Sequence, residues 1–211
     1  MLPRRKYRIF DVKRLLVASK NKNKLKEIRK ILASLNVEVN SAYDFCSMSG
    51  DIAETGSSFE ENASIKALTF SKEVEDFVIA DDSGLCVDYL NGEPGIFSAR
   101  FAGEDATDKQ NNEKLLEKLR GIDPEQRKAK FVCVIALVKK GEIVKTFRGE
   151  CHGNIAEKPG GEGGFGYDPL FLLENGNTMA EISAEEKNRI SHRARALEKL
   201  KKFIGNYQCE D

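Results

Sequence analysis

The sequence contains no tryptophan, no long apolar run and no excess of either charge. Its Lys+Arg and Asp+Glu counts are both 34, so there is no overall positive field to hold a nucleic acid. No apolar stretch approaches the ~20 residues that a helix needs to cross a bilayer. We therefore expect neither a nucleic-acid partner nor a membrane, and recognition of phosphate must depend on a local group of cations.

Cysteines at metal-binding or redox spacing are also missing. The five cysteines are odd in number and widely spaced, with no C-x-x-C pair. They are typical of reduced thiols, so we expect a cytoplasmic protein.

The basic start, residues 1–13, lacks the apolar centre of a signal peptide and is interpreted as a short extra arm.

The length and the order of the apolar segments predict one mixed α/β domain. A chain of 211 residues buries a sizeable core, so we expect one domain over residues 1–211, with a cleft between two lobes. Residues 131–138 are apolar on both faces, as in a central strand, and a short turn joins them to residues 143–148. This hairpin predicts a mixed sheet. Residues 85–90 are expected to form a further strand, and residues 107–120 a helix.

Two adjacent carboxylates, Asp81 and Asp82, follow the short apolar strand at residues 77–79. Ser83 and Gly84 come next. Strand ends in α/β sheets are where ligands bind, and neighbouring carboxylates suit a hard divalent cation beside phosphates. The same residues are common turn formers, so a surface turn is the alternative for this stretch alone.

A lysine-rich loop joins the strand at residues 15–18 to a helix with apolar residues from Leu25 to Leu35. Lysines at a helix N-terminus oppose the helix dipole, and they are expected there when an anion binds among them and the free N–H groups. A solvated lysine face is the alternative. The loop residues are Ser19, Lys20, Asn21, Lys22, Asn23 and Lys24.

The next helix is predicted by a capping box, Ser58 with Glu61, and by an apolar stripe over residues 59–74. Lys66 lies on another face of this helix. Glu54 precedes the cap and has no capping role. Taken alone, an exposed carboxylate at that position indicates nothing about function.

A glycine-dense segment, residues 159–169, contains Phe165 and Tyr167 and leads into a short apolar strand. A pocket for a planar base would use both features, because aromatic faces stack and glycines let the backbone approach a ligand. A mobile turn with buried aromatics is the alternative.

The C-terminal part has a second capping box, Ser183 with Glu186, and ends in a helix with an apolar stripe from Ala194 to Ile204. Basic side chains near the helix starts indicate, by themselves, only solvated charge. These cations are Lys187, His192 and Arg193. The spacing suggests no Ser/His/Asp triad.

Six motifs occur in a fixed order along the chain. They are Ser19-x-Asn21-x-x-Lys24, Glu54-Thr55-Gly56 with Phe59-x-Glu61-Asn62-Ala63, Ala80-Asp81-Asp82-Ser83-Gly84-Leu85, Pro94-Gly95-Ile96-Phe97-Ser98-Ala99-Arg100, Gly164-Phe165-Gly166-Tyr167-Asp168-Pro169 and Glu186-Lys187-Asn188-x-x-Ser191-His192-Arg193. Together they resemble the Ham1-like inosine triphosphate pyrophosphatases, from Leu15 to about Phe203. Two departures are Lys20, where glycine is common, and the longer N-terminal arm.

The resemblance implies an elongated mixed β-sheet flanked by helices, with two lobes and a central cleft, in a homodimer. It also implies an Mg²⁺-dependent enzyme that hydrolyses ITP, dITP and XTP to the monophosphate and pyrophosphate. Glu54 and Asp82 are implied at the metal site, with Asp82 as the proton acceptor. Residues implied at the nucleotide are Ser19, Lys20, Asn21, Lys22, Asn23, Lys24, Lys66, Ser83, Phe165, Gly166, Tyr167, Asp168, Lys187, His192 and Arg193.

The chemistry of this reaction agrees with those residue types. Attack of water on the α-phosphorus requires metal ions to offset phosphate charge, lysines to neutralise the leaving pyrophosphate, and a carboxylate to orient or deprotonate water. Whether Asp82 takes the proton or chiefly holds the metal stays open. We hypothesise that Arg193 or His192 donates to the 6-oxo group of the base while Phe165 or Tyr167 stacks on it.

Two other functions are compatible with parts of this pattern. A pyrophosphatase of the related Maf-like group would act on other nucleotides, but Ser191-His192-Arg193 argues against it. A non-catalytic nucleotide- or RNA-binding module would use the lysine loop and the glycine-aromatic segment. The balanced charge disfavours RNA, and the carboxylates would not help to bind it.

Overall fold

The structure is a computed structural model that describes residues 12–48, 50 and 52–208. Its strands are β1 (Arg14–Val17), β2 (Glu38–Ser41), β3 (Phe77–Val87), β4 (Lys128–Lys139), β5 (Glu142–Ile155) and β6 (Phe171–Leu172). Its α-helices are α1 (Lys22–Leu32), α2 (Phe59–Ser71), α3 (Asp108–Lys118), α4 (Ala184–Ile190) and α5 (His192–Gln208). Short 3₁₀ helices are η2 (Ala42–Asp44), η3 (Asp88–Leu90), η4 (Gly95–Arg100) and η5 (Pro124–Gln126). The predicted arm lies outside the described residues except for residues 12 and 13.

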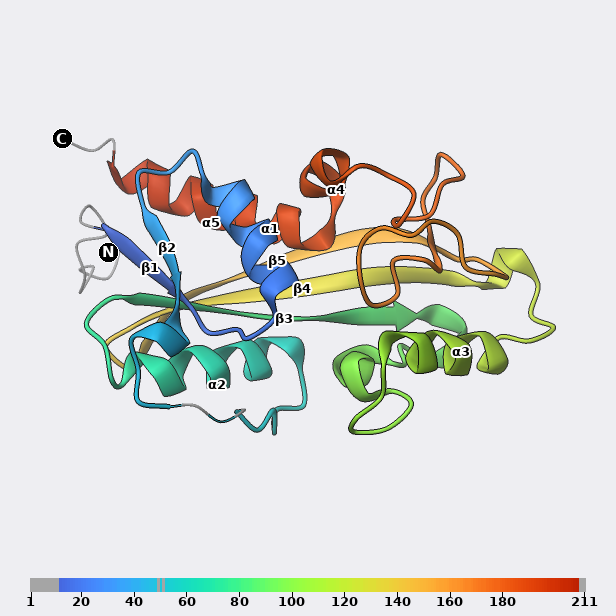
Figure 1. The fold of residues 1–211 in the computed structure, drawn as a ribbon, viewed down its shortest axis with the longest axis horizontal. Helices are drawn as coiled ribbons and strands as arrows, with labels where there is room; N and C mark the ends of the chain where they lie inside the picture. Colours follow the sequence, from blue (N-terminus) through green and yellow to red (C-terminus); the bar gives the residue numbers. More distant parts are fainter. Residues whose placement is uncertain (1–11, 49, 51, 209–211) are drawn as a thin grey trace, which may run out of the picture.

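The strands form one elongated, curled sheet in the order β2-β1-β3-β4-β5-β6, with helices on both faces (Figure 1). The mixed sheet is confirmed, because β1 lies parallel to β2 and β3, whereas β3, β4, β5 and β6 pair antiparallel. The predicted hairpin is β4 with β5. It turns at Lys140 and Gly141, both with positive φ, as tight hairpin turns require.

β3 is one continuous strand that carries Asp81 and Asp82 in its middle. The predicted break after residue 79 and the separate strand at residues 85–90 were wrong. The β3 residues pair with β4 without interruption from Val78 to Val87, so the ladder supplies the hydrogen bonds that a turn would otherwise make. In the described chain β1 pairs with β3 only as far as Ile79, which leaves this edge of β3 open beside the carboxylates.

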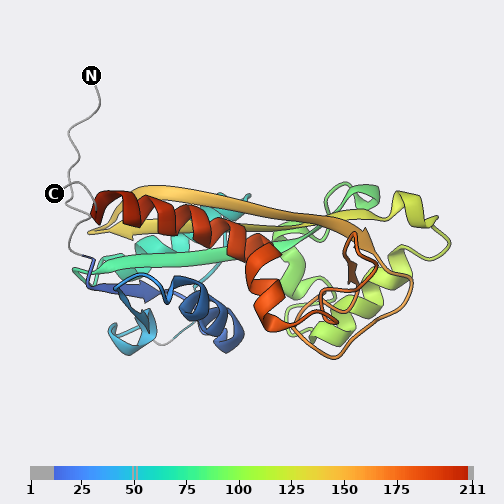
Figure 2. The ribbon, with the colours of Figure 1, turned by 90° about the horizontal axis from the view of Figure 1, so that it is seen from above.

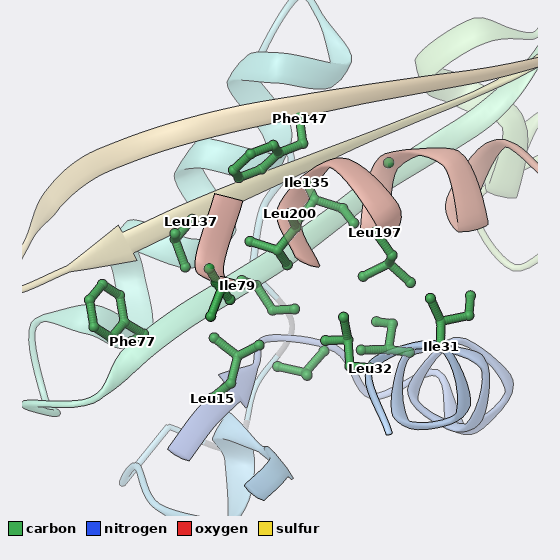
Figure 3. Close-up of a cluster of buried hydrophobic side chains, with 14 of the residues drawn as sticks. Leu15, Ile31, Leu32, Phe77, Ile79, Ile135, Leu137, Phe147, Leu197 and Leu200 are labelled. Atoms are coloured by element: carbon green, nitrogen blue, oxygen red, sulfur yellow. The ribbon is translucent and has the colours of Figure 1, made fainter. Parts of the chain in front are cut away.

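Each face of the sheet buries an apolar cluster. On one face Leu15, Ile79 and Ile135 of the strands meet Leu32 of α1 and Leu197 of α5 (Figure 3). On the other face the strands pack against α2. Residues of that second cluster include Leu16, Ala63, Phe70, Val78 and Val134. The even and odd residues of β3 therefore face different helices, as strand alternation requires.

The far ends of β3, β4 and β5 extend past β1 and β2 into a second lobe (Figure 1). There Leu85 and Phe131 pack with Leu115 of α3, with Tyr167 of the glycine-rich segment and with Phe171 of β6. The predicted pair of lobes is confirmed, and the long strands connect them.

Helix α5 lies along the strands and begins directly on the sheet (Figure 2). A Cβ atom at Gly149 of β5 would come within 2.2 Å of the His192 carbonyl oxygen and 2.5 Å of the Ala196 nitrogen. Only glycine permits so close an approach. The start of α5, with Arg193, is thereby held against the middle of the sheet.

The predicted helix caps are mostly confirmed. Ser58 Oγ accepts from the Glu61 nitrogen at 3.2 Å, and Ser183 Oγ accepts from the Glu186 nitrogen at 3.1 Å. Neither predicted capping box is complete: the Glu61 carboxylate accepts from the Ser57 nitrogen instead, and at Ser183 only the serine half of the box forms. The four cysteines in the described chain are free thiols, as predicted. None of the helices described there is long and apolar enough to span a membrane.

Candidate active site

One group of charged side chains lies between β3 and α2. Lys66 Nζ donates to Asp82 Oδ1 at 2.8 Å and to Glu54 Oε1 at 2.6 Å. Arg100 of η4 lies 3.7 Å from the other oxygen of Glu54. Asp82 Oδ2 is buried and has no hydrogen-bond partner within the described residues. The structure thus brings together Glu54 and Asp82, the two predicted metal ligands, from positions far apart in the sequence.

The protonation of this group reflects both burial and charge. Burial raises the pKa of Asp82, the Lys66 ammonium partly offsets that rise, and Glu54 adds to it. Burial lowers the pKa of Lys66, but the Asp82 and Glu54 carboxylates outweigh it and the net pKa is raised. Lys66 is therefore a cation, and Asp82 is a carboxylate that takes up a proton more readily than an exposed one.

The Glu54–Asp82 pair suits a hard divalent cation. Both carboxylates already converge on one ammonium, and Asp82 has an oxygen left without a partner. Within the described chain no three His, Cys, Asp or Glu side chains form a metal cluster. Two carboxylates are a donor number that Mg²⁺ can use, because it takes one or two carboxylates together with waters and substrate phosphates.

A second charged group lies on the opposite face of β3, around Asp81. Its Oδ2 accepts from Arg193 Nε at 2.9 Å and from Cys133 Sγ at 3.1 Å, and Lys24 Nζ donates to Oδ1. Arg193 Nη2 also donates to Ser83 Oγ at 3.0 Å. Burial would raise the pKa of Asp81, but the Arg193 and Lys24 cations hold it well below its ordinary value. Asp81 is a permanent anion that anchors both cations.

Glu27 of α1 completes this second group and was not predicted. It accepts from Arg193 Nη1, and it lies 3.1 Å from Lys187 Nζ. Lys187 also donates to Asp168 Oδ2 at 2.6 Å. The only sequence signal for Glu27 is its position three residues after Lys24, which places both side chains on one face of α1.

A cavity of about 150 Å³ opens beside the Asp81 group, where residues of both lobes meet. The half-buried Phe165 ring lies there, with Lys187 Nζ 4.5 Å and Arg193 Cζ 5.7 Å from its centroid. The predicted residues that line the cavity are Asn21, Lys24, Ser83, Phe165, Gly166, Tyr167, Asp168, Lys187, His192 and Arg193. Its wall also includes Leu85, Ser98, Asp108, Asn111 and Phe131, for which we predicted no role.

The two aromatic residues of the glycine-rich segment have different surroundings. Tyr167 is buried in the core, and its hydroxyl donates to the Ser98 carbonyl at 2.9 Å. Asp168 is also buried, and it accepts from the Phe165 nitrogen at 2.8 Å. Burial raises the pKa of Asp168, and Lys187 partly offsets the rise. Phe165 is therefore the ring whose face is available to a base.

His192 forms part of the cavity wall in an uncharged state. Its ring stacks on Phe131, with centroids 4.7 Å apart and an interplanar angle of 18°. Burial and the adjacent Arg193 cation lower its pKa well below the ordinary value. Its Nδ1 atom is buried without a hydrogen-bond partner in the described structure.

The lysine-rich loop divides between two sites. Asn21 and Lys24 line the cavity, and the Asn21 side chain also caps α1 by accepting from the Asn23 and Lys24 nitrogens. By contrast, a separate groove between α1 and η2 is lined by Ser19, Lys20 and Lys22. Lys20 Nζ lies 5.2 Å from the centroid of the Tyr43 ring.

Comparison with known proteins identifies the family. The Ham1 family profile matches residues 15–203. This chain belongs to the Ham1 family. A dITP/XTP pyrophosphatase of Listeria innocua serovar 6a is 50% identical over 192 residues, which are 90% of this chain and 94% of that protein. The dITP/XTP pyrophosphatase of Geobacillus kaustophilus is 52% identical over 190 residues, covering 90% and 93% of the two chains.

Solved Ham1 structures share this fold. The HAM1 protein from Coxiella burnetii superposes with a TM-score of 0.83 at 41% identity, covering 92% of this chain and 98% of that one. The Ham1 protein of Staphylococcus aureus gives a TM-score of 0.82 at 43% identity, covering 92% and 99%. All candidate site residues, from Ser19 to Arg193, lie inside the range that matches the Ham1 family.

Proposed function

We propose that this protein hydrolyses non-canonical purine nucleoside triphosphates, namely dITP, XTP and ITP, to the monophosphate and pyrophosphate. The observation that carries the proposal is the pairing of two sites across β3. The partly unsatisfied carboxylate of Asp82 lies on one face of the strand, and the cavity with Phe165 and Arg193 lies on the other. The Listeria and Geobacillus relatives carry the name of the same activity.

The phosphate chemistry is assigned to the group between β3 and α2. Glu54 and Asp82 would hold Mg²⁺, which when bound offsets the negative charge of the phosphates. Asp82 orients the attacking water and accepts its proton, a role that its raised pKa favours. Lys66 keeps both carboxylates in place, and with Lys24 it neutralises charge on the leaving pyrophosphate.

The base is assigned to the cavity beside Asp81. The Phe165 face stacks on the purine, next to the Lys187 and Arg193 cations. Arg193, held by Asp81 and Glu27, donates to the 6-oxo group, as does the protonated nitrogen of the neutral His192. Adenine presents an amino group at that position, so donors would face donors, at a cost of about 1–3 kcal/mol.

One assay tests the proposal. Purified protein with Mg²⁺ is expected to release pyrophosphate from dITP, XTP and ITP at least tenfold faster than from ATP, about the discrimination that one unpaired buried donor provides. Asp82→Asn is expected to reduce the rate at least a hundredfold while thermal unfolding shows a folded protein. Absence of pyrophosphate release from all three substrates, or full activity of Asp82→Asn, would contradict it.

Two further predictions are a homodimer, which the family resemblance implies, and a cytoplasmic location, which the unpaired cysteines indicate. Sedimentation equilibrium tests the first, because a dimer has twice the mass of the 23.6 kDa chain. Fractionation of source cells, followed by detection of the protein in the soluble fraction, tests the second.

A further inference from the structure

Both backbone hydrogen-bonding groups of Gly166 are held by side chains of α3. Asp108 Oδ2 accepts from the Gly166 nitrogen at 2.7 Å, and Asn112 Nδ2 donates to the Gly166 carbonyl at 2.8 Å. The same Asn112 nitrogen donates to the Asp108 carbonyl, also at 2.8 Å. The two bonds to Gly166 span 58 and 54 residues of sequence, so they are tertiary contacts between α3 and the glycine-rich segment.

The two contacts add to those of the neighbouring residues, since the Phe165 nitrogen donates to Asp168 and Tyr167 is buried in the core. Gly166 has φ +64°, in the left-handed region, and has no side chain with which to pack. Asn112 is only 9% exposed, so its bond to Gly166 is shielded from water. Phe165, directly before Gly166, is only half-buried and projects into the cavity. The position of its ring therefore depends on the α3 contacts to Gly166 as well as on the bond from its own nitrogen to Asp168.

We propose that Asp108 and Asn112 are positioning residues that set the Phe165 ring at stacking distance from the base. Asp81 and Glu27 fix the cations of the cavity from β3 and α1, whereas α3 fixes the aromatic platform from the other lobe. The gap that a planar base enters is thus bounded by contacts from both lobes, and Asp168 links them by accepting from the Phe165 nitrogen and from Lys187 Nζ. The inference rests on the proposed function, in which Phe165 stacks on the purine.

Binding of the two products separates this role from a general structural one. For Asn112→Ala we expect about a tenfold rise in the Kd of IMP, the effect of one buried hydrogen bond, with less than a twofold change in the Kd of pyrophosphate. The KM for ITP should rise more than kcat falls. Glu113→Ala is the control, because this exposed residue on the same helix makes, among the described residues, only an i,i+4 pair with Lys109.

Asp108 is exposed, unlike the buried Asn112, so its variants test the contact with Gly166 without changing a buried residue. Asp108→Asn retains an oxygen that accepts from the Gly166 nitrogen, whereas Asp108→Ala retains none. We expect Asp108→Ala to weaken IMP binding and Asp108→Asn to restore most of it. Because Asp108 is exposed, both variants are expected to fold even if Asn112→Ala does not.

The absence of tryptophan allows a direct optical test. In a Phe165→Trp protein the new indole is the only one, so IMP stacking should quench its fluorescence. Adding Asp108→Ala should lower the anisotropy of the free protein and reduce the quenching at saturating IMP. The inference would be overturned if adding Asp108→Ala to Phe165→Trp left the anisotropy unchanged and the Asp108→Ala and Asn112→Ala variants bound IMP with wild-type affinity. A Phe165→Ala variant that binds IMP normally would instead show that the proposed role of Phe165 is wrong.

Discussion

Lys66 Nζ donates to Asp82 Oδ1 at 2.8 Å, while the second oxygen of Asp82 is buried without a partner among the described residues. The carboxylate is thus stabilised on one side only. Burial, which raises its pKa, acts against Lys66, which lowers it. The balance between these two effects decides the pH below which Asp82 is protonated and no longer accepts a proton from water.

Replacing Lys66 should therefore shift the acid side of the pH–rate profile. In Lys66→Met the cation that lowers the pKa of Asp82 is gone, so the pKa rises further and activity is lost at a higher pH than in the wild type. The measurement is kcat/KM for dITP against pH at saturating Mg²⁺. Lys72→Met, at the exposed end of the same helix, should leave the profile unchanged. If the acid limb of the Lys66→Met profile instead lies at a lower pH than that of the wild type, Lys66 does not lower the pKa of Asp82.

Asp81 should contribute to stability because it is the buried partner of two cations. Its side chain is 1% exposed, like that of Arg193, so Asp81→Asn leaves the buried guanidinium with Glu27 as its one remaining carboxylate partner among the described residues. We expect the free energy of unfolding in urea to fall by about 3 kcal/mol. Asp76→Asn, which removes a more exposed partner of Arg14, should cost less than about 1 kcal/mol. Equal losses would contradict the anchoring role.

The division of the lysine-rich loop predicts unequal effects of its lysines. Lys24, which with Lys66 is assigned to the leaving pyrophosphate, is bound to Asp81, whereas Lys22 lines the groove beside η2. Lys24→Ala should raise the Kd of pyrophosphate about tenfold, since hydrogen bonds to charged groups contribute about 1.5–3 kcal/mol. Lys22→Ala should change it less than threefold, and inosine binding should be nearly unaffected by either. Isothermal titration calorimetry with pyrophosphate and with inosine measures these effects. A larger loss of pyrophosphate affinity in Lys22→Ala than in Lys24→Ala would contradict the prediction.

Buried His192 should make stability depend on pH. Its folded-state pKa lies well below the unfolded value of about 6.5, so below that pH the unfolded chain binds a proton that the folded chain does not. The neutral state of His192 therefore lowers the free energy of unfolding only below about pH 6.5. There the free energy of unfolding falls as the pH drops, by at most about 1.4 kcal/mol per pH unit. Denaturation between pH 7 and 5 should show a smaller slope in His192→Gln. Exposed His152→Gln should retain the wild-type slope.

Several parts of the fold followed from local sequence. Ser58 and Ser183 begin helices because a side-chain oxygen accepts from an N–H group three residues ahead, an interaction within one turn. The β4–β5 hairpin follows from two apolar runs with Lys140-Gly141 between them. The six motifs likewise indicate the family, since motif order is a property of the chain alone.

The sequence by itself determined the family, the mixed sheet and the set of polar residues from which the site is built. Tertiary structure alone decided that β3 passes unbroken through Asp81 and Asp82, because pairing with β4 outweighs the turn preference of those residues. It also placed Glu27 beside Arg193 and buried Tyr167 while leaving Phe165 at the cavity. Such choices depend on contacts like Arg193–Asp81, which are 112 residues apart and leave no trace in local spacing.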